Sequence, residues 1–185
     1  IEYLATHPAT AKHIARKLAQ HFIADDPPQS AINALAHSFM QTGGDLAAVT
    51  HTLIGLPEAW GEQPLKYKSP HEHVVSAFRA LGLNDIDEGI VQSYEVLGQR
   101  AFGAPSPQGW PDAQDKWLSG DGLMRRVEWS QAVSSRLGHA YDARKIAPQV
   151  LGNWLSGDTV FLLQGAPTAQ DALALLFLAP EFQRR

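Results

Sequence analysis

The chain contains no cysteine among its 185 residues. Disulfide bonds, thiolate metal sites and cysteine nucleophiles are therefore excluded. The absence does not indicate a compartment, because a protein without cysteine is stable on either side of a bacterial membrane. The sequence also lacks an apolar run of about 20 residues, which a membrane-spanning helix needs, and it does not open with a signal peptide. We therefore expect no transmembrane segment in this chain.

Charge is also scarce, because charged residues make up 18% of the chain and the formal net charge is −4. The basic residues form no long run, whereas a nucleic-acid-binding surface normally shows a clustered basic face. We therefore predict no nucleic-acid partner. The glycine-rich phosphate-binding motifs and the Gly-x-Ser-x-Gly nucleophile elbow are missing too. Without a catalytic motif, the sequence leaves open whether the protein is an enzyme.

Histidine, by contrast, is abundant, with eight residues. His71 and His73 flank Glu72 at a predicted helix start, but residues two apart on a helix point in different directions. The metalloprotease pattern places two histidines four residues apart on one face, and no pair in this sequence has that spacing. We therefore predict no bound metal ion and no cofactor; a metal site assembled from separate helices is the alternative, and it would leave no spacing signal in the sequence.

The clearest element is a predicted helix over residues 6–24. Pro8 suits the first helical turn, and the N-cap would be Thr6 or His7, of which Thr is the more usual. The apolar residues recur at three- and four-residue spacing and should share one buried face: Ala11, Ile14, Ala15, Leu18 and Phe22. The polar residues of the opposite side include His13 and Arg16.

Further helices follow, separated by proline and glycine. They are predicted over residues 29–41, 46–56, 70–81, 85–98, 120–139, 142–154, 156–164 and 169–178. The helix over 120–139 should turn apolar residues such as Leu123, Val127 and Leu137 inward, and Pro148 should make 142–154 either two short helices or one kinked helix. Ser69, Pro70 and Glu72 together form a capping-box signal. Periodicity alone leaves residues 156–164 open between strand and helix, although their flanks favour a helix with Ser156 as cap. The sequence therefore predicts an all-α, compact multi-helix domain of roughly eight to ten helices.

Residues 100–116 differ from the rest, since proline, glycine and aromatic residues are concentrated there. A loop of this length is uncommon in a compact domain and is often functional or packed by its own side chains. We expect Phe102, Trp110 and Trp117 to pin it to the protein body, either as an ordered connector or as a binding loop. Residues 1–185 then form a single domain, with a subdivision into 1–99 and 117–185 joined by this loop.

Arg125 and Arg126 are neighbours on a predicted helix, so only one of them can face inward. An inward guanidinium should hold a carboxylate or a helix C-terminus, because buried charges are paired; an anionic-ligand site is the alternative. The candidate binding residues chosen from the sequence are His13, Arg16, His71, Phe102, Trp110 and Arg126. Convergence of these side chains on one pocket would favour an enzyme.

One short sequence pattern occurs twice in the chain. Residues 53–60 and 176–182 both end a predicted helix in Pro-Glu, followed one or two residues later by an aromatic residue. Pro-Glu readily begins a new helical turn, and the aromatic ring can fold back on the preceding helix. Two copies fall short of a solenoid, for which at least about three repeats are needed.

Several motifs together resemble one family. They are the stretches 7–18, 42–46, 68–70 and 97–99, the Phe-Gly-Ala-Pro-Ser-Pro-Gln-Gly-Trp-Pro motif of residues 102–111, and the terminal Pro-Glu-Phe-Gln-Arg-Arg of residues 180–185. This set resembles the bacterial domain-of-unknown-function family 1800 from end to end of the chain. The sequence departs at residues 56–60, where members tend to have Ser-Pro-Glu-Phe.

The resemblance implies a largely helical bacterial protein. Members of that family are longer, so we expect this chain to be a C-terminal part whose N-terminal region is missing. Some members are exported, to the periplasm or cell envelope, and many are encoded beside another exported protein family, whose product is then a candidate partner. No activity carries over to particular residues.

Two hypotheses follow for the function. The first is a non-catalytic helical module with a protein-interaction or structural role. The alternative is part of an enzyme that acts on a cell-envelope or polysaccharide substrate, with catalytic groups partly in the missing region.

Overall fold

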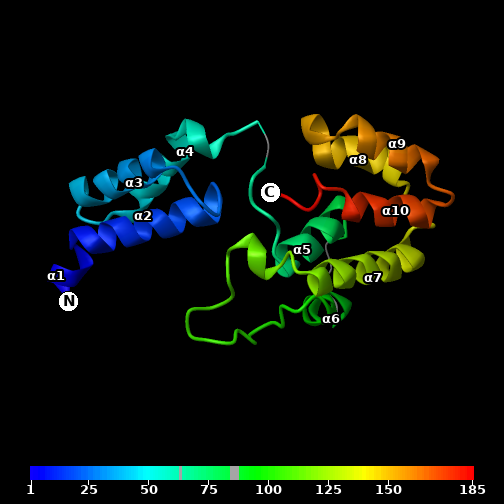
Figure 1. Ribbon diagram of the computed structural model, residues 1–185, viewed down its shortest axis with the longest axis horizontal. Coiled ribbons are helices and arrows are strands. Elements are labelled where there is room, and N and C mark those ends of the chain that lie inside the picture. Colours follow the sequence, from blue (N-terminus) through cyan, green and yellow to red (C-terminus); the bar gives the residue numbers. More distant parts are fainter. Residues whose placement is uncertain (63, 84–87) are drawn as a thin grey trace. The chain divides into compact units, whose positions relative to one another are not determined.

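The computed structural model is built from helices throughout (Figure 1). It describes residues 1–62, 64–83 and 88–185, and within them it contains ten α-helices, three short 3-10 helices and no β-strand. Tyr67 and Arg184 form an isolated antiparallel bridge. The prediction of an all-α fold with about eight to ten helices is therefore confirmed.

The chain divides into two compact units, Ile1–Lys66 and Tyr67–Arg185, which are called unit 1 and unit 2 below. The 100–116 loop, at which the sequence suggested a subdivision, lies inside unit 2. The helices on either side of this loop pack together, since α6 (Glu88–Val96) contacts α7 (Gly120–Leu137). The Tyr67–Arg184 bridge also joins the first part of unit 2 to its last.

In the described part of unit 1, four helices surround a small apolar core. These are α1 (Glu2–Ala5), α2 (Pro8–Phe22), α3 (Gln29–Gln41) and α4 (Leu46–Gly55), followed by the 3-10 helix η1 (Pro57–Ala59). Helix α3 packs against both α2 and α4. The buried side chains of α2 are Ala11, Ala15 and Ala19, and their small size allows the axes of α2 and α3 to come close.

The start of α2 uses the second of the two predicted N-cap residues, and the end of its apolar face differs from prediction. His7 is the N-cap, and its Nδ1 accepts a hydrogen bond from the Ala9 N–H at 3.1 Å; the Thr6 hydroxyl donates instead to the Glu2 carbonyl at 3.0 Å. Phe22, expected inside, is 54% exposed. The buried positions recur every four residues and reach Ile23, which leaves Phe22 at the edge of the face.

Outside residues 84–87, unit 2 has six helices around a larger core. Besides α6 and α7 these are α5 (Pro70–Ala80), α8 (Ala143–Leu151), α9 (Gly157–Gly165) and α10 (Ala169–Leu178), with two 3-10 helices, η2 (Gln114–Lys116) and η3 (Gly152–Trp154). Helix α10 packs against α7, α8 and α9. It supplies the fully buried Leu173, Leu176 and Phe177, so it is the central helix of this unit.

The inward face of α7 is largely polar. Arg126, Trp129, Ser130 and Ser134 are buried, whereas Leu123, which was expected inside, is 43% exposed. Small side chains on this face suit a close helix pair. A Cβ added to Gly138, just after α7, would lie 2.6 Å from the Cα of Gln170 in α10.

The predicted helix starts of unit 2 are confirmed where the structure describes them. Ser69 and Glu72 form both bonds of the predicted capping box at the start of α5. Residues 156–164, left open between strand and helix, form α9 with Ser156 as N-cap. Helix α8 continues through Pro148 to Leu151, so this proline does not divide it into two short helices. Residues 84–87, where the start of the fifth predicted helix falls, lie outside the described residues.

The two Pro-Glu segments, residues 53–60 in unit 1 and 176–182 in unit 2, have the same local structure. Helices α4 and α10 each have ten residues, and each is followed by an extended residue and then Pro-Glu. Glu58 accepts a hydrogen bond from the Ser30 hydroxyl in the first turn of α3 at 2.7 Å. Glu181 accepts from the Ser156 N–H, at the N-cap of α9, at 3.0 Å. Glu58 thus lies at the positive, N-terminal end of α3, and Glu181 lies at that of α9, where a carboxylate is stabilising.

Candidate functional site

The 100–116 loop is held to unit 2 by contacts at its two ends. Just before the loop, the Gln99 side chain accepts a hydrogen bond from the His71 N–H at 2.7 Å. Just after the loop, the buried Trp117 donates its indole N–H to the Pro111 carbonyl at 3.0 Å, and the Trp110 ring lies 6.0 Å from the Trp117 ring. The prediction that both tryptophans pin the loop is thus confirmed.

Phe102 does not anchor the loop, contrary to prediction. Its exposed fraction is 109%, that of a fully solvated side chain. Its φ angle is +55°, in the left-handed region where a side chain with a Cβ is strained by about 1–2 kcal/mol. The loop therefore presents an unburied aromatic ring on a strained backbone.

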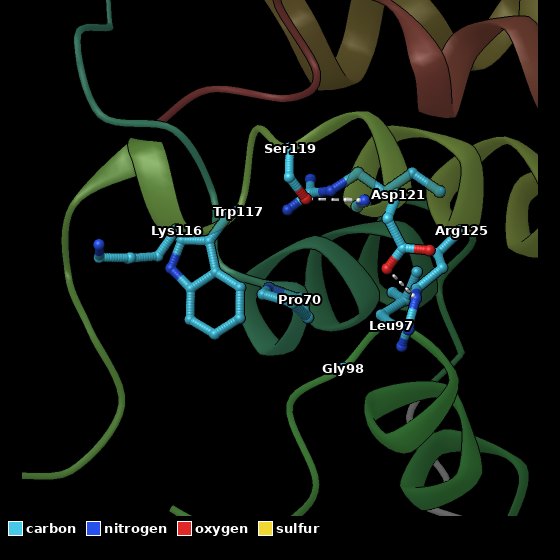
Figure 2. Close-up of a pocket in the computed structure, with 10 residues that line it drawn as sticks. Pro70, Leu97, Gly98, Lys116, Trp117, Ser119, Asp121 and Arg125 are labelled. Atoms are coloured by element: carbon cyan, nitrogen blue, oxygen red, sulfur yellow. Dashed lines mark hydrogen bonds and ion pairs between the residues drawn. The ribbon is translucent and has the colours of Figure 1, made fainter. Parts of the chain in front are cut away.

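A cavity of about 210 Å³ lies where α7 begins. Pro70, Leu97, Gly98, Lys116, Trp117, Ser119, Asp121, Gly122, Arg125 and Arg126 line it. The Trp117 ring faces Pro70, and the Asp121 carboxylate faces the Arg125 guanidinium (Figure 2), with Arg125 Nε 2.8 Å from Asp121 Oδ2. The cavity thus combines an apolar wall with charged groups from the first turns of α7.

Arg126 is one of the largest buried side chains of unit 2, with an exposed fraction of 2%. Its Nη1 donates to Gln183 Oε1 and its Nη2 to the Lys68 carbonyl, both at 2.5 Å. The guanidinium also lies 4.4 Å from the centre of the Tyr67 ring. The prediction that one arginine faces inward is confirmed, but its hydrogen-bond acceptors are neutral oxygens and the predicted carboxylate is not among them.

Gln183 connects this cluster to the core. It accepts a second hydrogen bond from the Tyr67 hydroxyl at 3.0 Å and donates to the Phe177 carbonyl, in the last turn of α10, at 2.6 Å. Burial lowers the pKa of the Arg126 guanidinium from its ordinary value. The charge is nevertheless supported by two charge-assisted hydrogen bonds and an aromatic face.

Two further basic side chains lie close to Arg126. Lys68 Nζ donates to the Phe182 carbonyl at 2.7 Å, and burial lowers the Lys68 pKa to about 8, although the Glu72 carboxylate opposes this shift. His73 is fully buried against the Trp129 and Phe182 rings. Burial, reinforced by the charges of Arg126 and Lys68, lowers the pKa of His73 well below its ordinary value, so the imidazole is neutral near pH 7.

The six candidate residues fall in both units. His13 and Arg16 lie on the exposed side of α2 in unit 1. In unit 2, His71 is exposed at the start of α5, with its ring 4.9 Å from that of Tyr94. Phe102 and Trp110 lie on the 100–116 loop, and Arg126 is the one candidate among the cavity-lining residues.

Sequence reasoning missed most of the residues around the cavity. Trp117 was expected only as an anchor, Asp121 and Gln183 were not considered as site residues, and Arg125 was weighed with Arg126 but not chosen as a candidate. The adjacent Arg125 and Arg126 were the usable signal, since one of two adjacent helical residues must face outward. Nothing in the sequence indicated that Gln183 would reach across to Arg126.

Residues 1–62, 64–83 and 88–185 contain no cluster of three or more histidine, aspartate or glutamate side chains placed to hold a metal ion. No helix in the same part of the chain is long and apolar enough to cross a membrane.

Comparison with known proteins assigns the chain to a family. The family model described as "Protein of unknown function (DUF1800)" matches residues 1–184. The chain belongs to this family. No curated protein and no solved structure matches the chain.

Several of the motifs that carried the resemblance have a structural role in this DUF1800 chain. Phe182 is fully buried, Gln183 holds Arg126, and Arg185 Nε lies 2.6 Å from Glu72 Oε1. Gly43 and Gly44, in the 42–46 motif, have φ angles of +63° and +90°, which glycine adopts without strain. The 102–111 motif is different, because it contains the exposed Phe102.

Proposed function

We propose that this chain is a non-catalytic helical module that binds a protein partner through the 100–116 loop. The observation that carries the proposal is Phe102, whose ring is fully exposed while its backbone is in a left-handed conformation. A phenylalanine in this position contributes no burial within the chain and strains its own backbone, so the fold of unit 2 gains nothing from it.

Burial of the Phe102 side chain in a partner would outweigh the strain of its backbone. Transfer of a phenylalanine side chain from water to an apolar pocket is worth about 1.5–3 kcal/mol, which exceeds the backbone strain. Aromatic side chains are also common at the centres of protein interfaces. Phe102 is therefore suited to be the central docking side chain of the loop.

The attachment of the loop supports the same interpretation. Trp117 is buried and bonded to Pro111, and Gln99 is bonded to the backbone of His71. A loop that is held at its ends loses less conformational freedom on binding than a free segment, and this improves affinity. Protein recognition is favoured over a carbohydrate platform, because Trp110 and Trp117 are not exposed together and Trp117 is buried.

The test is the affinity of the full-length protein for the product of the neighbouring gene, the partner that the family resemblance suggests. We expect Phe102→Ala to weaken binding by about tenfold or more in calorimetry, the usual effect of truncating a central aromatic residue. Phe161→Ala is the matched control, since Phe161 is an exposed phenylalanine on α9, in the same unit. Equal affinities for the wild type and Phe102→Ala, or equal losses in the two variants, would refute docking through the loop.

A further inference from the structure

The cavity at the start of α7 is lined by three cationic side chains and one carboxylate. The cations are Lys116, Arg125 and Arg126, and the carboxylate is Asp121. Lys116 points away from the Asp121–Arg125 pair in Figure 2 and lies 3.2 Å from Asp115. Arg126 is bonded through both Nη atoms to Gln183 and Lys68. Arg125 is therefore the cation placed to bind a ligand in this cavity.

The two Nη atoms of Arg125 are available as donors for a ligand. Its Nε pairs with Asp121, and within the described residues neither of its Nη atoms donates to a protein acceptor. The Nη1 atom lies over Gly98, 3.5 Å from where a Cβ at that position would be. The guanidinium is thus oriented by Asp121 on one edge and keeps its other edge for an acceptor, which is the geometry used to bind a carboxylate with two parallel hydrogen bonds.

The rest of the lining is apolar where the ligand would continue. Trp117, Pro70 and Leu97 form a wall beside the ion pair. The volume of about 210 Å³ suits a single residue and is too small for a polypeptide segment that passes through. A ligand that fits would have one negative group and one apolar group close together, and these groups would be at the end of its chain.

We propose that this cavity binds the C-terminal carboxylate of a polypeptide partner whose last residue is apolar. Arg125 binds the carboxylate, and Trp117, Pro70 and Leu97 contact the terminal side chain. The inference rests on the proposed function, because it specifies a second contact with the same partner. Ser119 caps α7 through its hydroxyl, which accepts from the Gly122 N–H at 3.1 Å, and the guanidinium, not the helix end, supplies the recognition.

The test uses small probes and the indole N–H signal of Trp117 in a ¹H–¹⁵N spectrum of the full-length protein. N-acetyl-L-phenylalanine carries both groups, and its amide lacks only the charge. Acetyl-phenylalanyl-glutamic acid amide carries the carboxylate on an internal side chain. We expect N-acetyl-L-phenylalanine to shift the Trp117 signal with an affinity at least about tenfold higher than either of the other probes, as expected for a charge-assisted pair.

Two variants identify the group responsible. Arg125→Gln should weaken N-acetyl-L-phenylalanine binding by about tenfold or more, while Arg136→Gln, which removes an exposed arginine at the other end of α7, should leave it unchanged. Equal binding of the amide would overturn the role of charge, and equal binding of the glutamic acid probe would overturn the chain-end assignment. No shift with any probe would overturn the site itself.

The outcome is separable from that of the proposed function. Phe102 is not among the cavity-lining residues, so Phe102→Ala should leave probe binding unchanged even where it abolishes partner binding. Loss of partner affinity in Phe102→Ala without any probe binding would retain the docking loop and remove the carboxylate site.

Discussion

Replacement of Arg126 by methionine should destabilise unit 2 strongly. Methionine fills much of the same space but provides no donor, so the Lys68 carbonyl and the Gln183 side-chain oxygen each lose a bond of 2.5 Å. The Gln183 oxygen keeps its hydrogen bond from the Tyr67 hydroxyl, but the Lys68 carbonyl loses its donor, and a buried acceptor without a partner costs about 1–3 kcal/mol. Loss of the contact with the Tyr67 ring adds about 1 kcal/mol or more, and relief from burying a charge offsets part of the total.

The net effect should be a decrease of about 3–5 kcal/mol in the free energy of unfolding of unit 2, the usual cost of removing one partner from a buried charged cluster. Urea denaturation followed by near-ultraviolet circular dichroism would measure it, because Trp129 lies beside this cluster against His73 and Phe177. Arg125→Met is the control on the adjacent residue. Its surface ion pair with Asp121 is worth at most about 1 kcal/mol.

A double-mutant cycle with Gln183→Leu makes the reasoning refutable. If Gln183 acts through Arg126, the two substitutions together should cost clearly less than the sum of the single losses, with a coupling of about 1–3 kcal/mol. Additive effects would show that each side chain stabilises the unit independently. A loss for Arg126→Met no larger than that for Arg125→Met would refute the assigned role of the cluster.

Three further predictions concern single positions. Phe102→Gly should raise the unfolding free energy by about 1 kcal/mol relative to Phe102→Ala, because glycine adopts a positive φ without strain; equal stabilities in urea titrations would contradict the assigned strain. The pKa of His73 is lowered in the folded state, so the unfolded state binds more protons and stability should fall below about pH 6.5, by up to ~1.4 kcal/mol per pH unit. His73→Leu should remove that slope, and identical pH profiles would refute it. Glu181→Ala should cost about 1 kcal/mol of unfolding free energy and so lower the melting temperature, because Glu181 accepts from the Ser156 N–H and the Thr159 hydroxyl. A decrease in melting temperature no larger than that of Glu128→Ala, on the exposed surface of α7, would count against this role.

Local signals in the sequence were sufficient for most helix boundaries. A capping serine followed by proline and glutamate specifies a helix start through bonds within four residues, and Ser69, Pro70 and Glu72 form that start as predicted. The end of α3 was equally local, because Gly43 and Gly44 provide the positive φ angles that close a helix. Such signals need no knowledge of the rest of the fold.

The orientation of α7 could not be predicted, because its buried face does not follow apolar periodicity. The pattern of Leu123, Val127 and Leu137 suggested one inward face, whereas Arg126, Ser130 and Ser134 are the residues that are buried. Arg126 is inside because Gln183 and Lys68, 57 and 58 residues away in sequence, provide its acceptors. A pairing over that distance leaves no trace in a local pattern.

The loop illustrates a different limit of sequence reasoning. Composition identified residues 100–116 as unusual, and Trp110 and Trp117 as aromatic anchors, but treated Phe102 in the same way. Whether an aromatic side chain in a loop is buried depends on the backbone angle at that residue and on the surface beneath it. The φ angle of Phe102 and the contact between Trp117 and Pro111 are tertiary properties, and they distinguish the exposed ring from the buried one.

The bridge between Tyr67 and Arg184 brings the two ends of unit 2 together. Because its first and last residues lie side by side, a short flexible linker could join them, and new ends could be opened within the 100–116 loop. Circular permutation is tolerated best where termini are close and the new ends fall in an exposed loop. A permuted unit 2 that begins after the loop and ends before it should therefore keep the same helix packing. Arg126 would still bond to Gln183, which would still follow it in the chain, and to the Lys68 carbonyl, which would then follow it instead of preceding it.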